Sequence, residues 1–255
     1  MRLPRKLGHD DAASLVDHLD ELRARVVVSL LAVAAGFTVA YVFHPRLIGW
    51  LNAALPPGRR HPVTLGIAEP FMTSLKISLA AGFALALPVV LWQVWSYLAP
   101  ALEAHLQRTI SAFVAFATGL FAIGVGFGYK VALPAAVHFL TSYDSRLYDV
   151  QVRAQSYYSF ALMVLVAVGV VFEVPIFVLA LVRLRVVTAA RLRRSWRGGL
   201  AAMAVLAVAL PGVDPVTTTF EMLPLMALYL LSLGLATVLE PRWLPAPALA
   251  EQRGL

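Results

Sequence analysis

The sequence predicts an all-α, polytopic membrane protein with six transmembrane helices. Its 255 residues are 60% hydrophobic and only 14% charged. A soluble globular domain is about 45–50% apolar and about 25% charged, and much of its surface must face water. The apolar residues of this chain gather in long segments, each of which is a candidate membrane helix. Composition and segmentation together exclude a soluble, disordered or disulfide-built protein.

Six apolar segments are expected to cross the bilayer, at residues 26–43, 72–98, 110–129, 157–182, 198–210 and 216–239. A helix perpendicular to the membrane needs about 20 residues to cross it. The fifth segment is shorter than this because Pro211 follows it, and Pro224 is expected to interrupt the sixth. Helices 5 and 6 are therefore predicted to be short, and the loops at 45–71 and 130–156 are long enough to carry structure of their own.

Lysine and arginine predict the orientation. With the N-terminus inside, the inner segments hold fourteen of these residues and the outer loops six. This excess favours an N-in, C-in topology, because cytoplasmic loops are enriched in Lys and Arg. The predicted domains are a cytoplasmic amphipathic region at 1–25, a transmembrane domain at 26–239 and a short cytoplasmic tail at 240–255. No cleavable signal segment is expected at the N-terminus.

The N-terminal region predicts an amphipathic helix. Leu15, Leu19, Leu22 and Val26 fall on one helical face, opposite charged residues. Such a helix is expected to lie on the membrane surface and then turn into the first transmembrane segment.

An enzyme is not expected. The chain has no cysteine, no pair of histidines at metal-ligand spacing inside the membrane, and no phosphate-binding or nucleophile motif. We therefore predict no metal and no cofactor. The basic excess is interpreted as a topology signal rather than as a nucleic-acid site, and the arginine run at 191–197 as an inside-facing anchor.

Acidic residues within the apolar segments are the strongest candidates for function. A charge at the bilayer centre costs roughly 3 kcal/mol or more unless it faces water or a partner. Glu173 lies in the middle of the fourth segment, two residues before Pro175. It is either a protonated carboxyl bonded to a neighbouring helix or a polar group that lines a water-filled cavity, and we favour the cavity.

The hairpin between the fifth and sixth segments holds further polar residues. Asp214 lies in its tight turn, where turn and capping chemistry is expected. Glu221 and Thr218 lie in the first turns of the sixth segment and are expected to face a partner helix or a cavity. In the third segment, Gly124, Gly126 and Gly128 predict close helix packing rather than a dinucleotide site.

Six stretches, collinear over about residues 14 to 239, together resemble the TatC family of twin-arginine protein translocase subunits. They are H-L-D-E-L-R-A-R at 18–25, E-P-F at 69–71, L-P-V-V-L-W-Q-V-W-S-Y-L-A-P-A-L at 87–102, F-E-V-P at 172–175, P-G-V-D at 211–214, and L-P at 223–224 with L-Y at 228–229.

The resemblance implies a concave, glove-like bundle in the inner membrane that receives folded precursor proteins carrying twin-arginine signal peptides. It also implies assembly with single-span TatA- and TatB-type subunits, self-association and the use of the proton-motive force. The signal peptide would bind on the cytoplasmic face, with Glu21 as the acid for the arginine pair. The remaining positions that the resemblance implicates in binding or in the loops are Arg23, Arg25, Tyr97, Pro100, Glu103, Leu106, Asp214 and Pro224.

Three expected acids are missing. Leu106 stands where the family has a glutamate after helix 2, although Glu103 lies one helical turn earlier. Leu230 stands at a second acidic position, and Arg153, with Asp149 nearby, at a third. Two alternatives therefore stay open: a diverged paralogue with a structural or narrow-cargo role, and a proton-coupled secondary transporter. The transporter would use Glu173, Glu221 and Asp214 as a relay, but the sequence shows no inverted repeats.

Overall fold

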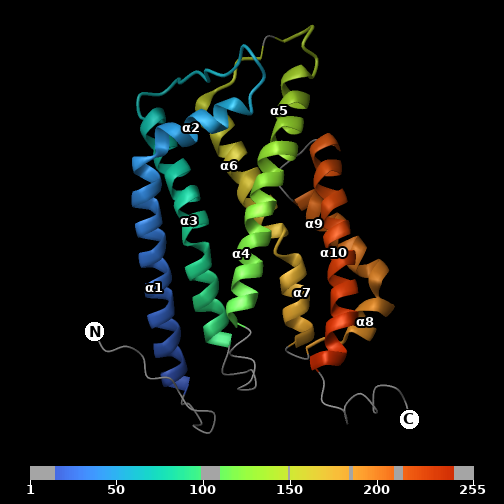
Figure 1. Ribbon diagram of the computed structural model, residues 1–255. Helices are drawn as coiled ribbons and strands as arrows, with labels where there is room; N and C mark the ends of the chain where they lie inside the picture. Colours follow the sequence, from blue (N-terminus) through green and yellow to red (C-terminus); the bar gives the residue numbers. More distant parts are fainter. Residues whose placement is uncertain (1–14, 99–109, 149, 184–185, 210–214, 244–255) are drawn as a thin grey trace. The chain divides into compact units, whose positions relative to one another are not determined.

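The structure, a computed structural model, describes residues 15–98, 110–148, 150–183, 186–209 and 215–243. Its regular elements there are helices (Figure 1). They are α1 (Leu15–Val42), α2 (His44–Ala53), α3 (Glu69–Leu98), α4 (Ile110–Phe127), the π-turn η3 (Gly128–Ala132), α5 (Leu133–Ser142), α6 (Ala154–Val171), α7 (Val174–Arg183), α8 (Ala189–Arg194), α9 (Trp196–Ala209) and α10 (Pro215–Trp243). One isolated parallel β-bridge pairs Val63 with Arg153 in two connecting segments.

Five helical stretches of the described chain are long and apolar enough to cross a membrane. A sixth apolar helix, α9, has only 14 residues, as the sequence predicts for the fifth segment. The chain divides into two compact units. The first comprises Met1–Gly119 and Asp144–Leu162, and the second comprises Leu120–Tyr143 and Met163–Leu255.

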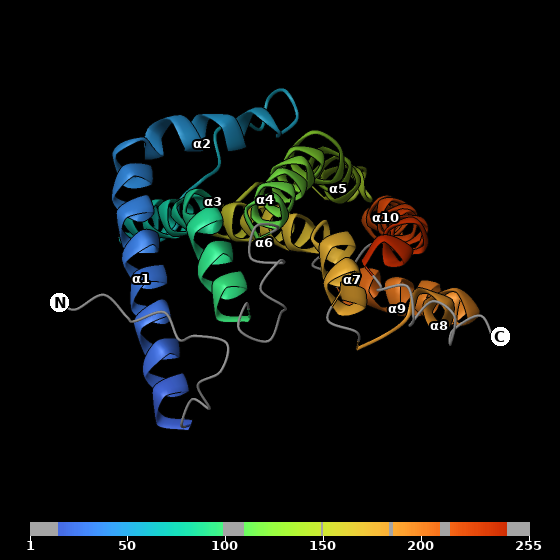
Figure 2. The same cartoon turned by 60° about the horizontal axis from the view of Figure 1, so that its bottom comes forward.

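The first unit is built on α1 and α3, which lie side by side in both views (Figures 1 and 2). Gly36 and Gly82 face each other where the two backbones approach. Small residues allow this approach, which is a common way for membrane helices to associate. The start of α6 is tied to α2, because the Tyr158 hydroxyl donates to Asn52 Oδ1 at 2.7 Å and the Tyr157 hydroxyl donates to the Leu51 carbonyl.

One sequence prediction for this part of the chain was wrong. The N-terminal amphipathic helix does not turn into the first segment, because α1 is one continuous helix from Leu15 to Val42. No glycine or proline lies between Leu15 and Ala35, so nothing in the backbone imposes a bend. The loop predicted at 45–71, by contrast, carries α2, as its length suggests.

The loop predicted at 130–156 is helical up to Ser142. The chain continues from α4 through the π-turn η3 into α5. Pro134 does not stop it, because this proline lies in the first turn of α5, where a missing N–H is tolerated.

The second unit contains the broken fourth segment and the α9–α10 hairpin. The helix stops after Val171 and resumes at Val174, next to Pro175, a break that the sequence analysis did not predict. Pro224, however, lies inside α10 and does not interrupt it. It is not a loop residue, and the sixth helix, with 29 residues, is not short. Membrane helices tolerate internal proline where neighbouring groups satisfy the freed carbonyl.

The glycines of α4 give a testable contrast. A Cβ on Gly124 would lie 2.7 Å from the Phe172 Cβ and 3.0 Å from the Gly169 Cα, whereas a Cβ on Gly126 would meet nothing within 4 Å. Close packing is thus confirmed at Gly124 and is wrong at Gly126.

We expect Gly124→Ala to destabilise the protein by about 1–3 kcal/mol through overpacking. Gly126→Ala should be neutral or stabilising, since alanine is the better helix former. Thermal unfolding of both purified variants in detergent measures the difference. Equal midpoints would show that α4 and α6 do not pack as described.

Candidate functional site

The first candidate site begins with an ion pair on α1. The Arg25 guanidinium donates to Glu21 Oε1 from Nε at 3.0 Å and from NH2 at 2.5 Å. The two residues are four positions apart, so they are neighbours on one face of the helix. Their side chains are only 22% and 15% exposed, which shields the pair from water.

Helix α3 completes this site. Gln93 Oε1 accepts a long hydrogen bond of 3.4 Å from Arg25 NH1, and the ring of His18 stacks on Tyr97 at 4.6 Å between centroids. We call these five residues, His18, Glu21, Arg25, Gln93 and Tyr97, the α1–α3 cluster. It joins the N-terminal part of α1 to the C-terminal part of α3.

The structure brings together some of the predicted binding residues. Glu21, Arg25 and Tyr97 belong to the α1–α3 cluster, whereas Arg23 is exposed. The other predicted positions of this site, Pro100, Glu103 and Leu106, lie outside the described residues. So do Asp149 and Asp214.

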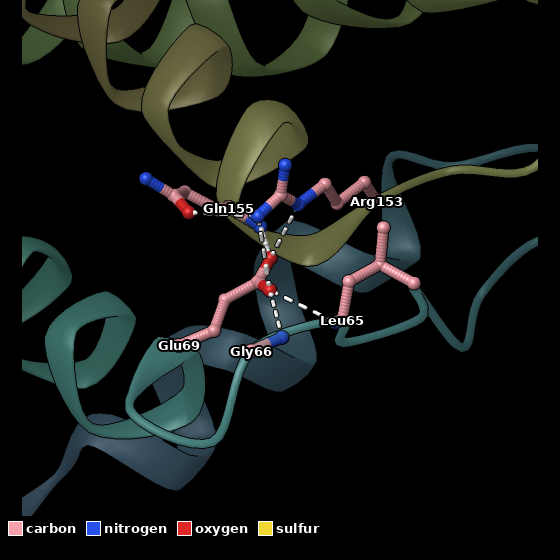
Figure 3. Close-up of polar contacts among 5 residues, drawn as sticks. All are labelled: Leu65, Gly66, Glu69, Arg153 and Gln155. Carbon is pink, nitrogen blue, oxygen red and sulfur yellow. Dashed lines mark hydrogen bonds and ion pairs between the residues drawn. The ribbon is translucent and has the colours of Figure 1, made fainter.

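The sequence did not predict a second polar site, the Glu69 cluster, made of Leu65, Gly66, Glu69, Arg153 and Gln155 (Figure 3). The backbone N–H groups of Leu65, Gly66 and Gln155 donate to the Glu69 carboxylate at 2.9, 3.0 and 2.9 Å. Arg153 adds a bond from Nε to Oε1 at 3.1 Å. The Glu69 side chain is 2% exposed and that of Arg153 is 44% exposed.

The Glu69 cluster fastens two connecting segments to each other. Beside it, the Val63 N–H donates to the Val152 carbonyl at 2.9 Å, and the Ala154 N–H donates to the Val63 carbonyl at 2.8 Å. Two sequence signals pointed to Glu69: its place in the E-P-F stretch and its position as an acid in the first turn of α3. The partner Arg153 was noticed only as a substitute for an expected acid.

The predicted intramembrane acids lie in the second unit. Glu173 occupies the break between α6 and α7, and both of its carboxylate oxygens are buried with no hydrogen-bond partner among the described residues. Glu221, on α10, is 2% exposed, and Thr218, one turn earlier, is partly buried. Leu225, Ala207 and Val171 form an apolar core in the same unit.

No group of three potential metal ligands occurs in the part of the chain that the structure describes. The fold and these sites define a class: a multi-pass α-helical membrane protein with buried acids and a charged cluster between two of its candidate spans.

Comparisons with known proteins identify the family. The family model for "Sec-independent protein translocase protein (TatC)" matches residues 17–224. The TatC protein of Deinococcus radiodurans is 35% identical over 248 residues, which cover 92% of each chain. The chloroplastic TATC protein of Arabidopsis thaliana is 33% identical over 89% of this chain and 68% of its own length.

Solved structures agree. A crystal structure of the twin arginine translocase receptor TatC superposes with a TM-score of 0.74 at 31% identity, over 87% of this chain and 98% of that one. A crystal structure of the twin arginine translocase receptor TatC in DDM superposes with a TM-score of 0.76 at 31% identity, over 86% of this chain and 99% of that one. The chain therefore belongs to the TatC family. It is a multi-pass inner-membrane component of the Sec-independent protein translocase, a transport protein rather than an enzyme.

Proposed function

We propose that this chain is the subunit that receives twin-arginine signal peptides, and that Glu21 in the α1–α3 cluster recognises the arginine pair. The observation that carries this proposal is the pairing of Glu21 with the guanidinium of Arg25, both with largely buried side chains. The Arg25 contact supports the view that this carboxylate can bind a guanidinium, for which a signal arginine would compete with Arg25.

Electrostatics supports arginine over lysine as the ligand. A planar guanidinium makes two parallel, charge-assisted bonds to one carboxylate, which an ammonium cannot reproduce. Both bonds from Arg25 go to Oε1, so Oε2 is open to a second guanidinium as far as the described residues show. A signal arginine would bind this oxygen or displace Arg25.

Further binding residues are expected just beyond the α1–α3 cluster along the chain. Tyr97, stacked on His18, lies one residue before Leu98, the last residue of α3, and Pro100, Glu103 and Leu106 come shortly after in the chain. We place the second binding carboxylate at Glu103, with Arg23 at the exposed margin.

The same proposal includes six membrane crossings with both termini on the cytoplasmic side. It also includes the domain limits 1–25, 26–239 and 240–255. The TatA- and TatB-type partners and self-association belong to it as well. The buried carboxyls of Glu173 and Glu221, with Thr218, would serve a polar path within the second unit, and Asp214 would shape the hairpin turn. Family membership favours this function over a small-solute transporter.

Substitution of Glu21 by glutamine is expected to weaken binding of an Arg-Arg signal peptide roughly tenfold or more, because a charge-assisted bond of about 1.5–3 kcal/mol is lost. The full chain in nanodiscs would be titrated with labelled Arg-Arg and Lys-Lys peptides. Asp20→Asn is the matched control, since it removes an exposed acid one position earlier. Wild-type affinity in Glu21→Gln would show that the site is elsewhere.

A further inference from the structure

A strongly basic surface lies on α8 and the start of α9, and none of its residues belongs to the sites described so far. It is made of Arg191, Arg193, Arg194 and Arg197, all of them exposed. No aspartate or glutamate occurs in the sequence between Glu173 and Asp214. Within the described residues, none of the four guanidinium groups is paired with a carboxylate. We call these four residues the α8 basic surface.

The α8 basic surface is held in place by specific bonds. The Thr188 side chain caps α8 by accepting the Arg191 N–H at 3.2 Å. Glu240 near the end of α10 accepts the Ala189 N–H at 3.1 Å, and Ala189 itself is 2% exposed. Glu240 thus binds the backbone at the start of α8. Helix α8 lies beside α10 in both views (Figures 1 and 2).

The position of this surface in the chain, between two apolar helices, is the one expected of residues at the depth of lipid headgroups. It lies between the candidate span Ala154–Arg183 and the apolar helix α9. The 14 residues of α9 rise about 21 Å, against a hydrocarbon thickness of about 30 Å. A helix this short draws the headgroups toward its ends, and Arg197 is its second residue.

The neighbouring aromatic residue fits the same position. Trp196 is 40% exposed, and the Arg197 guanidinium lies 5.6 Å from the centroid of its ring. Tryptophan is enriched where membrane and water meet, because its ring is apolar and its N–H is polar. An exposed tryptophan beside four unpaired arginines indicates a surface that faces a bilayer rather than open solvent.

We propose that the α8 basic surface binds the phosphate groups of anionic phospholipids in the adjacent leaflet. Guanidinium groups bind phosphate oxygens in a bidentate manner, and clusters of four to eight basic residues next to a membrane helix attract acidic lipids. This inference does not depend on the signal-peptide site.

Native mass spectrometry of the full chain tests this proposal, with phosphatidylglycerol and phosphatidylcholine as probes. The wild type should retain phosphatidylglycerol preferentially. The variant R191Q/R193Q/R194Q/R197Q should lose this retention roughly fivefold or more. The matched control R46Q/R60Q/K130Q/R146Q removes the same number of exposed charges elsewhere and should stay close to the wild type.

Three results would overturn the proposal: equal retention of the two lipids by the wild type, equal loss in the control, or displacement of the lipid by a short RNA or acidic peptide that needs the same arginines. If the fourfold variant does not fold, the pairs R191Q/R194Q and R193Q/R197Q replace it. Each pair should lose part of the preference, and unchanged retention in both would contradict the proposal.

Discussion

Replacing Gly82 by valine is expected to separate α1 from α3 and to cost about 3 kcal/mol of stability. A Cβ at Gly82 would lie 2.6 Å from the Phe37 Cα and 2.8 Å from the Gly36 carbonyl carbon. These are backbone atoms, which cannot rotate aside as the end of a side chain can. The two helices must therefore move apart.

The measurement is thermal unfolding of the purified variant, alongside Gly119→Val on α4. A Cβ at Gly119 would meet nothing within 4 Å, so that variant should keep the wild-type midpoint. Because the α1–α3 cluster requires the same helix pair, Gly82→Val should also lose Arg-Arg peptide binding. A stable Gly82→Val protein that binds peptide would refute the described contact.

Removal of the Glu69 carboxylate is the second large effect that we expect. In Glu69→Ala, the N–H groups of Leu65, Gly66 and Gln155 lose their acceptor. Four hydrogen bonds to one buried carboxylate are lost together in this variant, whereas Arg153→Ala removes only the bonds of one half-exposed side chain. Glu69→Ala should lower the unfolding midpoint by roughly 5–10 °C, and Arg153→Ala by much less.

A double-mutant cycle separates the ion pair from the backbone bonds. Once Glu69 is absent, Arg153→Ala should have little further effect, because the partner of Arg153 is already gone. Glu69→Gln keeps an acceptor oxygen and should fall between wild type and Glu69→Ala. If Arg153→Ala proves as damaging as Glu69→Ala, the ion pair and not the backbone bonds fastens the two segments.

Hydropathy predicted the helical spans well but not their ends. Pro224 was expected to interrupt the sixth segment, yet it lies within α10, and Pro134 lies in the first turn of α5 without ending the helical stretch. Whether a proline stops a helix depends on where its missing N–H falls and on what neighbouring helices supply. Periodicity along one chain does not contain that information.

The sites were predictable to the extent that they are local or match a motif. Glu21 and Arg25 are four residues apart, so their pairing follows from helix geometry alone. Gln93 and Arg153 come from distant segments, and nothing in a single sequence shows which segments meet. The roles of Glu103 and Leu106 stay predictions, because both lie outside the described residues.

Site-specific photocrosslinking in native-like membranes tests the receptor assignment most directly. Probes would replace Leu22, next to the intact Glu21, and Leu106, with Arg-Arg and Lys-Lys signal peptides offered side by side. The predicted result is crosslinking at both positions that requires the arginine pair and is lost in Glu21→Gln. Equal crosslinking of the two peptides, or none to a protein shown to be folded, would contradict signal recognition at this site.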